Sequence, residues 1–166
     1  MSDKRFELVS AGPWPDRYTF SPAVRAGSLL FLAGTTATDD DMQIVGPGDI
    51  VAQTRQIYRK FDALLRAAGG SLRDIVSTTE YVTTTENYGR TADVRREVFG
   101  GPPYPVATGV IVAGLLRPAA LIEISAVAVL HDPPHDVSPP EAGWARHEAE
   151  PVRRDAAPAG GRVEAP

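Results

Sequence analysis

The sequence contains no cysteine among its 166 residues. This absence excludes a disulfide framework, a metal site built on thiolates and a cysteine nucleophile. Long apolar runs are also missing, since none approaches the roughly 20 residues that a membrane-spanning helix needs. Basic charge is not in excess either: 17 lysine and arginine residues stand against 21 acidic ones, for a net charge of −4. We therefore expect a cytoplasmic protein that binds neither nucleic acid nor membrane, and a nuclease role is disfavoured.

Histidine is scarce, and all three histidines lie at or beyond residue 131. His131 and His135 have the i, i+4 spacing of a metal pair on a helix, but the prolines at 133 and 134 exclude a helix there. The run Asp39–Asp41 reads as solvated carboxylates in a hairpin turn. No glycine-rich phosphate loop is present. We expect no metal and no organic cofactor.

The composition changes sharply at residue 132. Seven of the last 35 residues are proline, and large apolar residues are few. Such a segment cannot bury enough apolar surface to offset the entropy of ordering it. The sequence therefore predicts one folded domain over residues 1–131 and a disordered tail over residues 132–166, in which Trp144 alone could anchor against a surface.

Residue periodicity predicts an α+β domain with the element order β-β-β-α-β-α-β-β. Asp49 is placed to cap the first helix, and Gly69 and Gly70 supply its left-handed stop. Ser71 and Asp74 form a capping box on a single turn. The expected strands are residues 6–9, 23–26, 29–33, 75–83, 107–112 and 121–130, and the expected helices are residues 50–68 and 86–99.

The last expected strand is apolar on both faces. Ile122, Ile124 and Ala126 alternate on one face, and Val127 and Val129 lie on the other. A strand of this kind needs cover on both faces, whereas two helices can cover only one face of a sheet. The second face is therefore expected to pack against other subunits.

Five short patterns follow one another over about 110 residues of the chain. They are Ala23-Val24-x-x-Gly27, Ala33-Gly34-Thr35 after an apolar strand, Gln53-Thr54, Ala67-Ala68-Gly69-x-Ser71-Leu72-x-Asp74-Ile75-Val76, and Ile122-Glu123-Ile124-x-Ala126-x-Ala128. In this order the sequence resembles the YjgF/Rid family, the reactive-intermediate deaminases that hydrolyse enamines and imines. The resemblance implies a chorismate-mutase-like mixed sheet with two helices on one face, assembled as a homotrimer with pockets at the subunit clefts.

The resemblance also implies a small-molecule site. Its substrate-binding positions are Phe20, Gly34, Thr35, Ala92, Ala107, Thr108 and Gly109, and its proton-handling position is Glu123. The family's Ser-Gly-Gln turn is here Ala33-Gly34-Thr35, and Thr108 stands at the last position of the Pro-Ala-Arg-Ser signature. At three further positions an apolar side chain replaces a polar one of the family. Phe20 stands where the family has tyrosine, Ala92 where asparagine is frequent, and Ala107 where the Pro-Ala-Arg-Ser signature has its arginine.

The missing arginine leaves three interpretations open. A guanidinium binds a substrate carboxylate through a planar pair of donors, and a methyl group offers nothing comparable. Arg95 or Arg96 could supply it instead, because both lie one turn beyond Ala92 on the second helix. Alternatively, the substrate has no carboxylate and the pocket favours a larger or less charged ligand. In the third interpretation, catalysis is lost.

Several candidates also have a structural reading. A carboxylate is rarely buried without a partner, so Glu123 either positions water and moves a proton or pairs across a subunit interface with an arginine such as Arg117. Tyr88, near the start of the second helix, either faces the cleft or belongs to the core. Threonine is frequent at strand ends for its β-propensity alone.

Two hypotheses on function follow. The first is a divergent Rid-like enzyme, a cofactor-independent hydrolase that deaminates an enamine or imine, or controls its tautomerisation or cyclisation, in a specialised metabolic pathway. The second is a non-catalytic trimer that binds a small molecule or a partner protein and retains only the fold.

Overall fold

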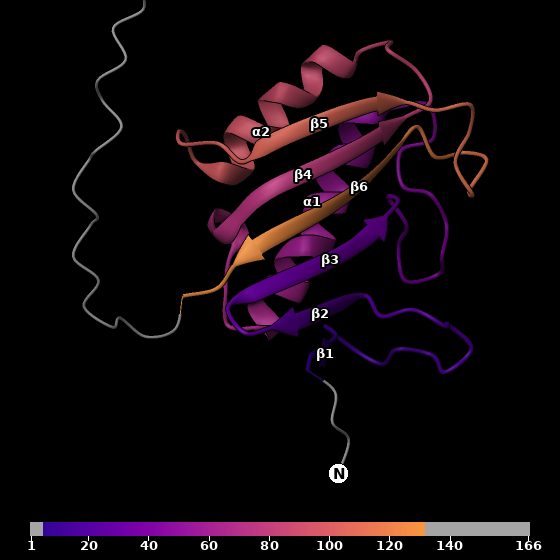
Figure 1. The fold of residues 1–166 in the computed structure, drawn as a ribbon. Helices are drawn as coiled ribbons and strands as arrows, with labels where there is room; N and C mark the ends of the chain where they lie inside the picture. Colours follow the sequence, from indigo (N-terminus) through magenta and orange to yellow (C-terminus); the bar gives the residue numbers. More distant parts are fainter. Residues whose placement is uncertain (1–4, 132–166) are drawn as a thin grey trace, which may run out of the picture. The chain divides into compact units, whose positions relative to one another are not determined.

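A computed structural model describes residues 5–131, which form a six-stranded mixed sheet with helices on one face (Figure 1). The strand order is β1-β2-β3-β6-β4-β5, and only the β4–β5 pair is parallel. The elements are β1 (Glu7–Val9), β2 (Ala23–Ala26), β3 (Leu29–Thr35), α1 (Ile50–Ala67), η1 (Leu72–Asp74), β4 (Ile75–Val82), η2 (Tyr88–Arg90), α2 (Thr91–Phe99), β5 (Val106–Ile111) and β6 (Ile122–Val129). The expected α+β order is confirmed, whereas the tail with Trp144 and His135 lies outside the described residues.

Helix α1 begins and ends where its capping residues predict. The Asp49 carboxylate accepts hydrogen bonds from the backbone N–H groups of Val51 and Ala52. Gly69 has a φ of 82°, the left-handed conformation that ends a helix. The capping box of Ser71 and Asp74 is also present, on the 3₁₀ turn η1.

The second helix begins later than expected. α2 begins at Thr91 rather than at residue 86, and a 3₁₀ turn, η2, precedes it. Asn87 has a φ of 56°, a left-handed conformation that an α-helix cannot include. Asparagine adopts this conformation more readily than most residues, so the local sequence stops the helix from extending towards its N-terminus.

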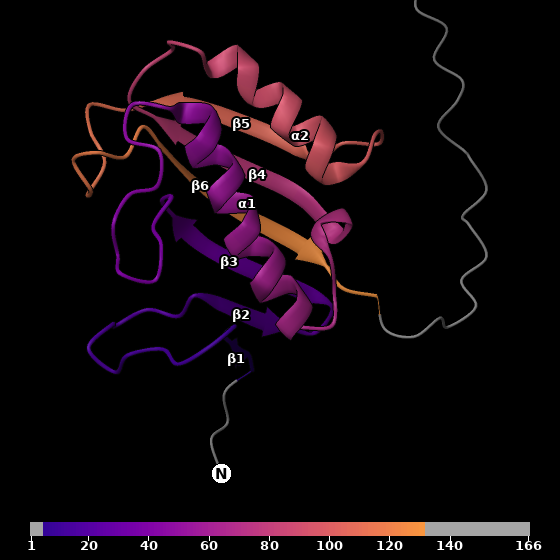
Figure 2. The ribbon, with the colours of Figure 1, turned by 180° about the vertical axis from the view of Figure 1, so that it is seen from behind.

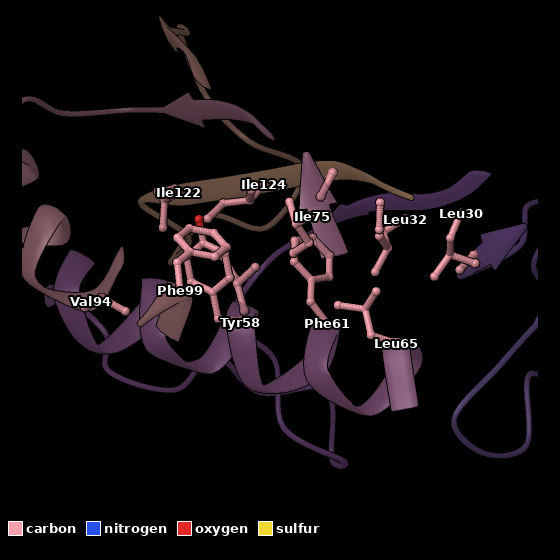
Figure 3. Packing of buried hydrophobic residues seen from close by; sticks show 14 of the residues in the cluster. Leu30, Leu32, Tyr58, Phe61, Leu65, Ile75, Val94, Phe99, Ile122 and Ile124 are labelled. Carbon is pink, nitrogen blue, oxygen red and sulfur yellow. The ribbon is translucent and has the colours of Figure 1, made fainter. Parts of the chain in front are cut away.

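The core lies between the sheet and the two helices (Figure 3). Tyr58, Phe61 and Leu65 of α1 are fully buried against Ile122 and Ile124 of β6 and their neighbours on β3. The ring of Tyr58 also meets Phe99 of α2 edge-on, at 5.4 Å between ring centroids. The inward residues of β6 alternate strictly with half-buried ones, as the sequence predicts.

The opposite face of the sheet carries no helix among the described residues (Figures 1 and 2). Apolar side chains remain exposed there, including Phe31 of β3, Val76 of β4 and Val106 of β5. Within residues 5–131, the helices therefore cover one face of the sheet and leave the other, apolar face uncovered.

Gln53 holds two loops against the start of α1. Its amide donates to the carbonyls of Gly46 and Ala119 and accepts from the backbone N–H of Leu121, over 2.8–3.1 Å. The side chain is fully buried. Because Leu121 directly precedes β6, this contact fixes where β6 begins and hence where Glu123 lies.

Candidate functional site

Glu123 lies beside a bulge in β3. The β3–β6 register pairs Leu32 with Ala126 but Thr35 with Ile124, so β3 has one extra residue there. A Cβ added to Gly34 would lie 2.6 Å from Glu123 Oε1. Because residue 34 is glycine, the space beside its Cα is free for the Glu123 carboxylate. The Glu123 side chain makes no hydrogen bond or ion pair with another described residue. Arg117, its expected partner, donates instead to the Met42 carbonyl.

The expected site residues lie on two faces of the sheet. Glu123 pairs with Tyr81, whose side chain is on the open face, away from the helices. Ala107 pairs with Thr78, which is buried on the helix-covered face. Within one chain, Glu123 and Ala107 therefore point away from each other, and a site containing both requires a second subunit.

A cavity of about 270 Å³ lies between α2 and the edge of the sheet at β5. Ala92 and Ala107 both line it, so the structure brings together two of the positions that resemblance implied. Its other lining residues are Thr78, Arg95, Arg96, Phe99, Tyr104 and Pro105. The walls thus combine apolar surface with two guanidinium groups from consecutive positions of α2.

A buried carboxylate pairs with one of the residues that line this cavity. Glu80 of β4 is 1% exposed. Tyr88 Oη donates to Glu80 Oε2 over 2.8 Å, and Arg95 Nη1 donates to both carboxylate oxygens over 3.0 and 3.1 Å. Arg95 Nη1 also donates to Thr91 Oγ1 over 3.0 Å. Glu80 is thus a buried acid paired by an arginine that also lines the cavity.

Burial and the charge of Glu80 raise the pKa of two phenols. Burial raises the pKa of Tyr88, and the hydrogen bond to the Glu80 carboxylate raises it further. Burial likewise raises the pKa of Tyr58, with the nearby Glu80 charge as the second cause. The Tyr58 hydroxyl is buried without a hydrogen-bond partner among the described residues.

Glu80 was not among the expected site residues, although the sequence contains a signal for it. Strand β4 alternates inward and outward residues, and Glu80 stands between Thr78 and Val82, both inward. A period of two therefore places the carboxylate in the core, where it requires a cation. Arg95 and Tyr88 follow 15 and 8 residues later, separations that only the packed structure converts into contacts.

The remaining expected residues have separate environments. Tyr88 packs against the core and its hydroxyl is bound to Glu80. A Cβ added to Gly109 would lie 3.0 Å from that hydroxyl. Thr108 pairs with Thr79 on the open face. Thr35 pairs with Ile124, and its hydroxyl donates to the Thr36 carbonyl over 3.3 Å.

Phe20 belongs to an exposed aromatic cluster outside the cavity. It is 55% exposed, and its ring lies 5.5 Å from the rings of both Trp14 and Tyr18. The Trp14 indole N–H donates to the Phe20 carbonyl over 2.8 Å. In the single chain, Phe20 therefore does not line the cavity that contains Ala92 and Ala107.

A half-buried lysine lies on α1, away from the cavity. Lys60 Nζ donates to the Thr36 carbonyl over 3.0 Å and to Thr38 Oγ1 over 2.8 Å. It pairs with no carboxylate within residues 5–131. Burial and, to a smaller extent, the charge of Arg117 lower the pKa of Lys60 to about 8.

Within the described part of the chain, no group of three or more histidine or acidic side chains could hold a metal ion. Asp39 lies in a turn and accepts a hydrogen bond from the Gln43 backbone N–H. The described helices include none long and apolar enough to cross a bilayer.

Comparison with known proteins shows where this architecture occurs. The family model described as endoribonuclease L-PSP matches residues 15–130. A RutC family protein of Pyrococcus horikoshii is 37% identical over 109 residues, which is 66% of this chain and 85% of the relative.

Solved structures of similar proteins have the same fold. Rv2704 of Mycobacterium tuberculosis, described as a member of the YjgF/YER057c/UK114 family, is 36% identical, with a TM-score of 0.63 over 75% of this chain and 99% of its own. YyfA of Yersinia pestis, from the conserved Rid protein family, is 28% identical, with a TM-score of 0.68 over the same shares. The chain therefore belongs to the YjgF/Rid family, whose family model is described as endoribonuclease L-PSP.

Proposed function

We propose that the protein is a cofactor-independent hydrolase that deaminates a small enamine or imine, or controls its tautomerisation or cyclisation, in a specialised metabolic pathway of the cytoplasm. The observation that carries the proposal is the carboxylate of Glu123. It lies over the glycine at the β3 bulge and is not engaged by another described side chain. Such a carboxyl is available to a substrate and to water.

The chemistry needs one proton-handling group. Hydrolysis of an imine adds water to the C=N carbon and transfers protons to nitrogen, which leaves as ammonia. A carboxylate can take a proton from the attacking water, and the resulting acid can return it to nitrogen. Glu123 has this role in the proposal. The backbone around Gly34 and Thr108 orients the substrate.

The proposed assembly is a homotrimer. The exposed apolar side chains of the open face favour burial against another subunit. In a cyclic trimer each interface joins two different surfaces. Glu123 of one protomer can then meet the cavity that contains Ala92 and Ala107 of its partner. Light scattering should give three chains per particle, and a monomer at micromolar concentration would contradict this part of the proposal.

A non-catalytic binding trimer is the second candidate. The substitution of apolar side chains at Phe20, Ala92 and Ala107 favours it, because drift after the loss of catalysis removes polar groups. The cavity would then bind a metabolite without turning it over.

Turnover and binding assays on the wild type and Glu123→Gln separate these two functions. Imines generated in situ from small and from larger apolar amino acids serve as substrates, and ammonia release is measured. The enzyme hypothesis predicts turnover by the wild type, loss of turnover in Glu123→Gln, and similar thermal stabilisation of both forms by ligand. If ligands stabilise both forms and neither shows turnover, the protein is a binding module.

A further inference from the structure

Lys60 carries a charge that the proposed chemistry does not use. The residue is half-buried on α1 and pairs with no carboxylate among residues 5–131. Its environment lowers the pKa to about 8, so the fold destabilises the charged form. Groups in such environments are concentrated at functional sites, which makes Lys60 a candidate for a role beyond packing.

Two neutral side chains on the same face of α1 make contacts of the same kind. Gln53 donates to the Gly46 carbonyl over 3.1 Å. Gln56 donates to the Thr38 carbonyl over 3.0 Å. Gln53, Gln56 and Lys60 are spaced at i, i+3 and i+7 and therefore lie along one face of the helix. An uncharged amide is thus sufficient to hold the segment after β3 against α1, and tethering alone does not explain an ammonium at position 60.

The oxygen that Lys60 binds is the Thr36 carbonyl, which accepts three hydrogen bonds. Its donors are the Thr38 N–H at 2.8 Å, Lys60 Nζ at 3.0 Å and Thr35 Oγ1 at 3.3 Å. Lys60 Nζ also donates to Thr38 Oγ1 over 2.8 Å, so the ammonium binds both ends of this three-residue turn. Thr36 and Thr38 are buried. Because a charged donor makes a hydrogen bond roughly twice as strong as a neutral one, Lys60 is the strongest contact that fixes the turn.

This turn directly follows the β3 bulge beside Glu123. The β3–β6 register shifts around Gly34 and resumes at Thr35. A bulge leaves one residue outside the ladder, so its conformation depends on the contacts that hold the strand on either side. On the C-terminal side these are the contacts of Thr36, which Lys60 holds. The Gly34 backbone in turn borders the space that the Glu123 carboxylate occupies.

We propose that Lys60 is a positioning residue of the active site. Its ammonium acts through the Thr36 carbonyl to fix the backbone at Gly34, and thereby the place from which the Glu123 carboxylate meets substrate and water. Lys60 lies on the helix-covered side of the sheet and Glu123 on the open side, so the ammonium acts only through the backbone. The inference rests on the proposed function, because it concerns the same carboxylate.

Kinetics and unfolding of Lys60→Met test this role. The variant should lower kcat for imine hydrolysis by at least roughly ten-fold and change KM by less than about two-fold, because the reacting group is displaced while the ligand contacts remain. Its free energy of unfolding at pH 7 should not decrease, because removal of a half-buried charge offsets the lost hydrogen bonds. Arg59→Met removes the neighbouring, exposed cation of α1 and should match the wild type in all three quantities.

Chemical rescue isolates the charge. The sequence has no cysteine, so Lys60→Cys introduces the one thiol of the chain. 2-Bromoethylamine alkylates this sulfur, with loss of bromide, and gives a lysine analogue in which sulfur replaces the γ-methylene. 2-Bromoethanol gives a side chain of the same length that ends in a neutral hydroxyl. The aminoethylated protein should recover most of the wild-type kcat, and the hydroxyethylated protein should not.

Amide exchange at Thr38 supplies a readout that does not require turnover. The Thr38 N–H donates to the carbonyl that Lys60 binds. In Lys60→Met its hydrogen exchange, measured by NMR, should become at least roughly ten-fold faster because the turn opens more often. Arg59→Met should leave this rate unchanged.

Each outcome decides the inference. An unchanged kcat in Lys60→Met, equal recovery by both alkylated proteins, or unchanged exchange at Thr38 would overturn it. The absence of turnover of any imine by the wild type would contradict the proposed function, and the exchange at Thr38 would then decide the inference alone.

Discussion

Removal of the Arg95 guanidinium is expected to destabilise the fold strongly. Glu80 is 1% exposed, and two of the three hydrogen bonds to its carboxylate come from Arg95. Arg95→Met leaves a buried carboxylate whose one remaining donor is the Tyr88 phenol. Breaking a buried ion pair from one side costs about 3–5 kcal/mol, because the remaining charge is uncompensated.

Denaturant unfolding at one fixed protein concentration measures this loss. The double variant Glu80→Gln, Arg95→Met removes both charges and should recover most of the stability, since a neutral amide can still accept from Tyr88. Arg66→Met, on an exposed pair, should change the free energy of unfolding by no more than about 0.5 kcal/mol. A loss below about 1 kcal/mol in Arg95→Met would refute the account of Glu80 as a charge that needs Arg95.

Three other changes have defined outcomes. Gly34→Ala should reduce kcat by at least roughly ten-fold and leave the free energy of unfolding nearly unchanged, because the new Cβ displaces the end of the Glu123 side chain but not the backbone. A kcat equal to that of the wild type would show that the position of Glu123 is unimportant. The difference in stability between the wild type and Lys60→Met should depend on pH. Burial lowers the pKa of Lys60 from 10.5 to about 8, so the wild type bears the full cost of burying the charge below pH 8 and a smaller cost above it. Chemical denaturation should therefore show that the wild type gains stability relative to Lys60→Met between pH 8 and pH 9.5. The same difference at both pH values would contradict a lowered pKa for Lys60. Ala107→Arg should add about 1.5–3 kcal/mol of affinity for small 2-oxo acids and should weaken the binding of larger apolar ligands by crowding, as measured by calorimetry. A folded variant with neither change would mean that residue 107 does not face the ligand.

Much of the fold could be predicted from local sequence signals. Asp49, Gly69 and the Ser71–Asp74 capping box each act within a few residues, and their positions set the ends of α1 and of the following turn. The alternation in β6 predicted both the buried face and the open apolar face. The predicted start of α2 was wrong because helical periodicity does not detect the conformation of a single residue, here the left-handed Asn87.

The site was harder to predict because its parts depend on sheet register and helix packing. Ala92 and Ala107, which the resemblance implied as neighbours, line one cavity, and Arg95 and Arg96 line it too. Glu123, in contrast, lies on the other face, since a period of two fixes its direction relative to Ile122 and Ile124. Glu80 was overlooked because its partners come from α2 and η2, and no local pattern links them to β4.

Activity of mixed trimers tests the central claim most directly. Glu123→Gln removes the proton-handling carboxylate, and Ala107→Trp fills the cavity on the other face of the sheet. Each variant alone should be a folded trimer without turnover. If each cleft takes Glu123 from one protomer and the cavity from its partner, random mixing of equal amounts leaves both halves intact in about a quarter of the clefts. The account predicts recovery of about a quarter of the wild-type ammonia release, and mixed trimers that remain inactive while the wild type turns over would contradict it.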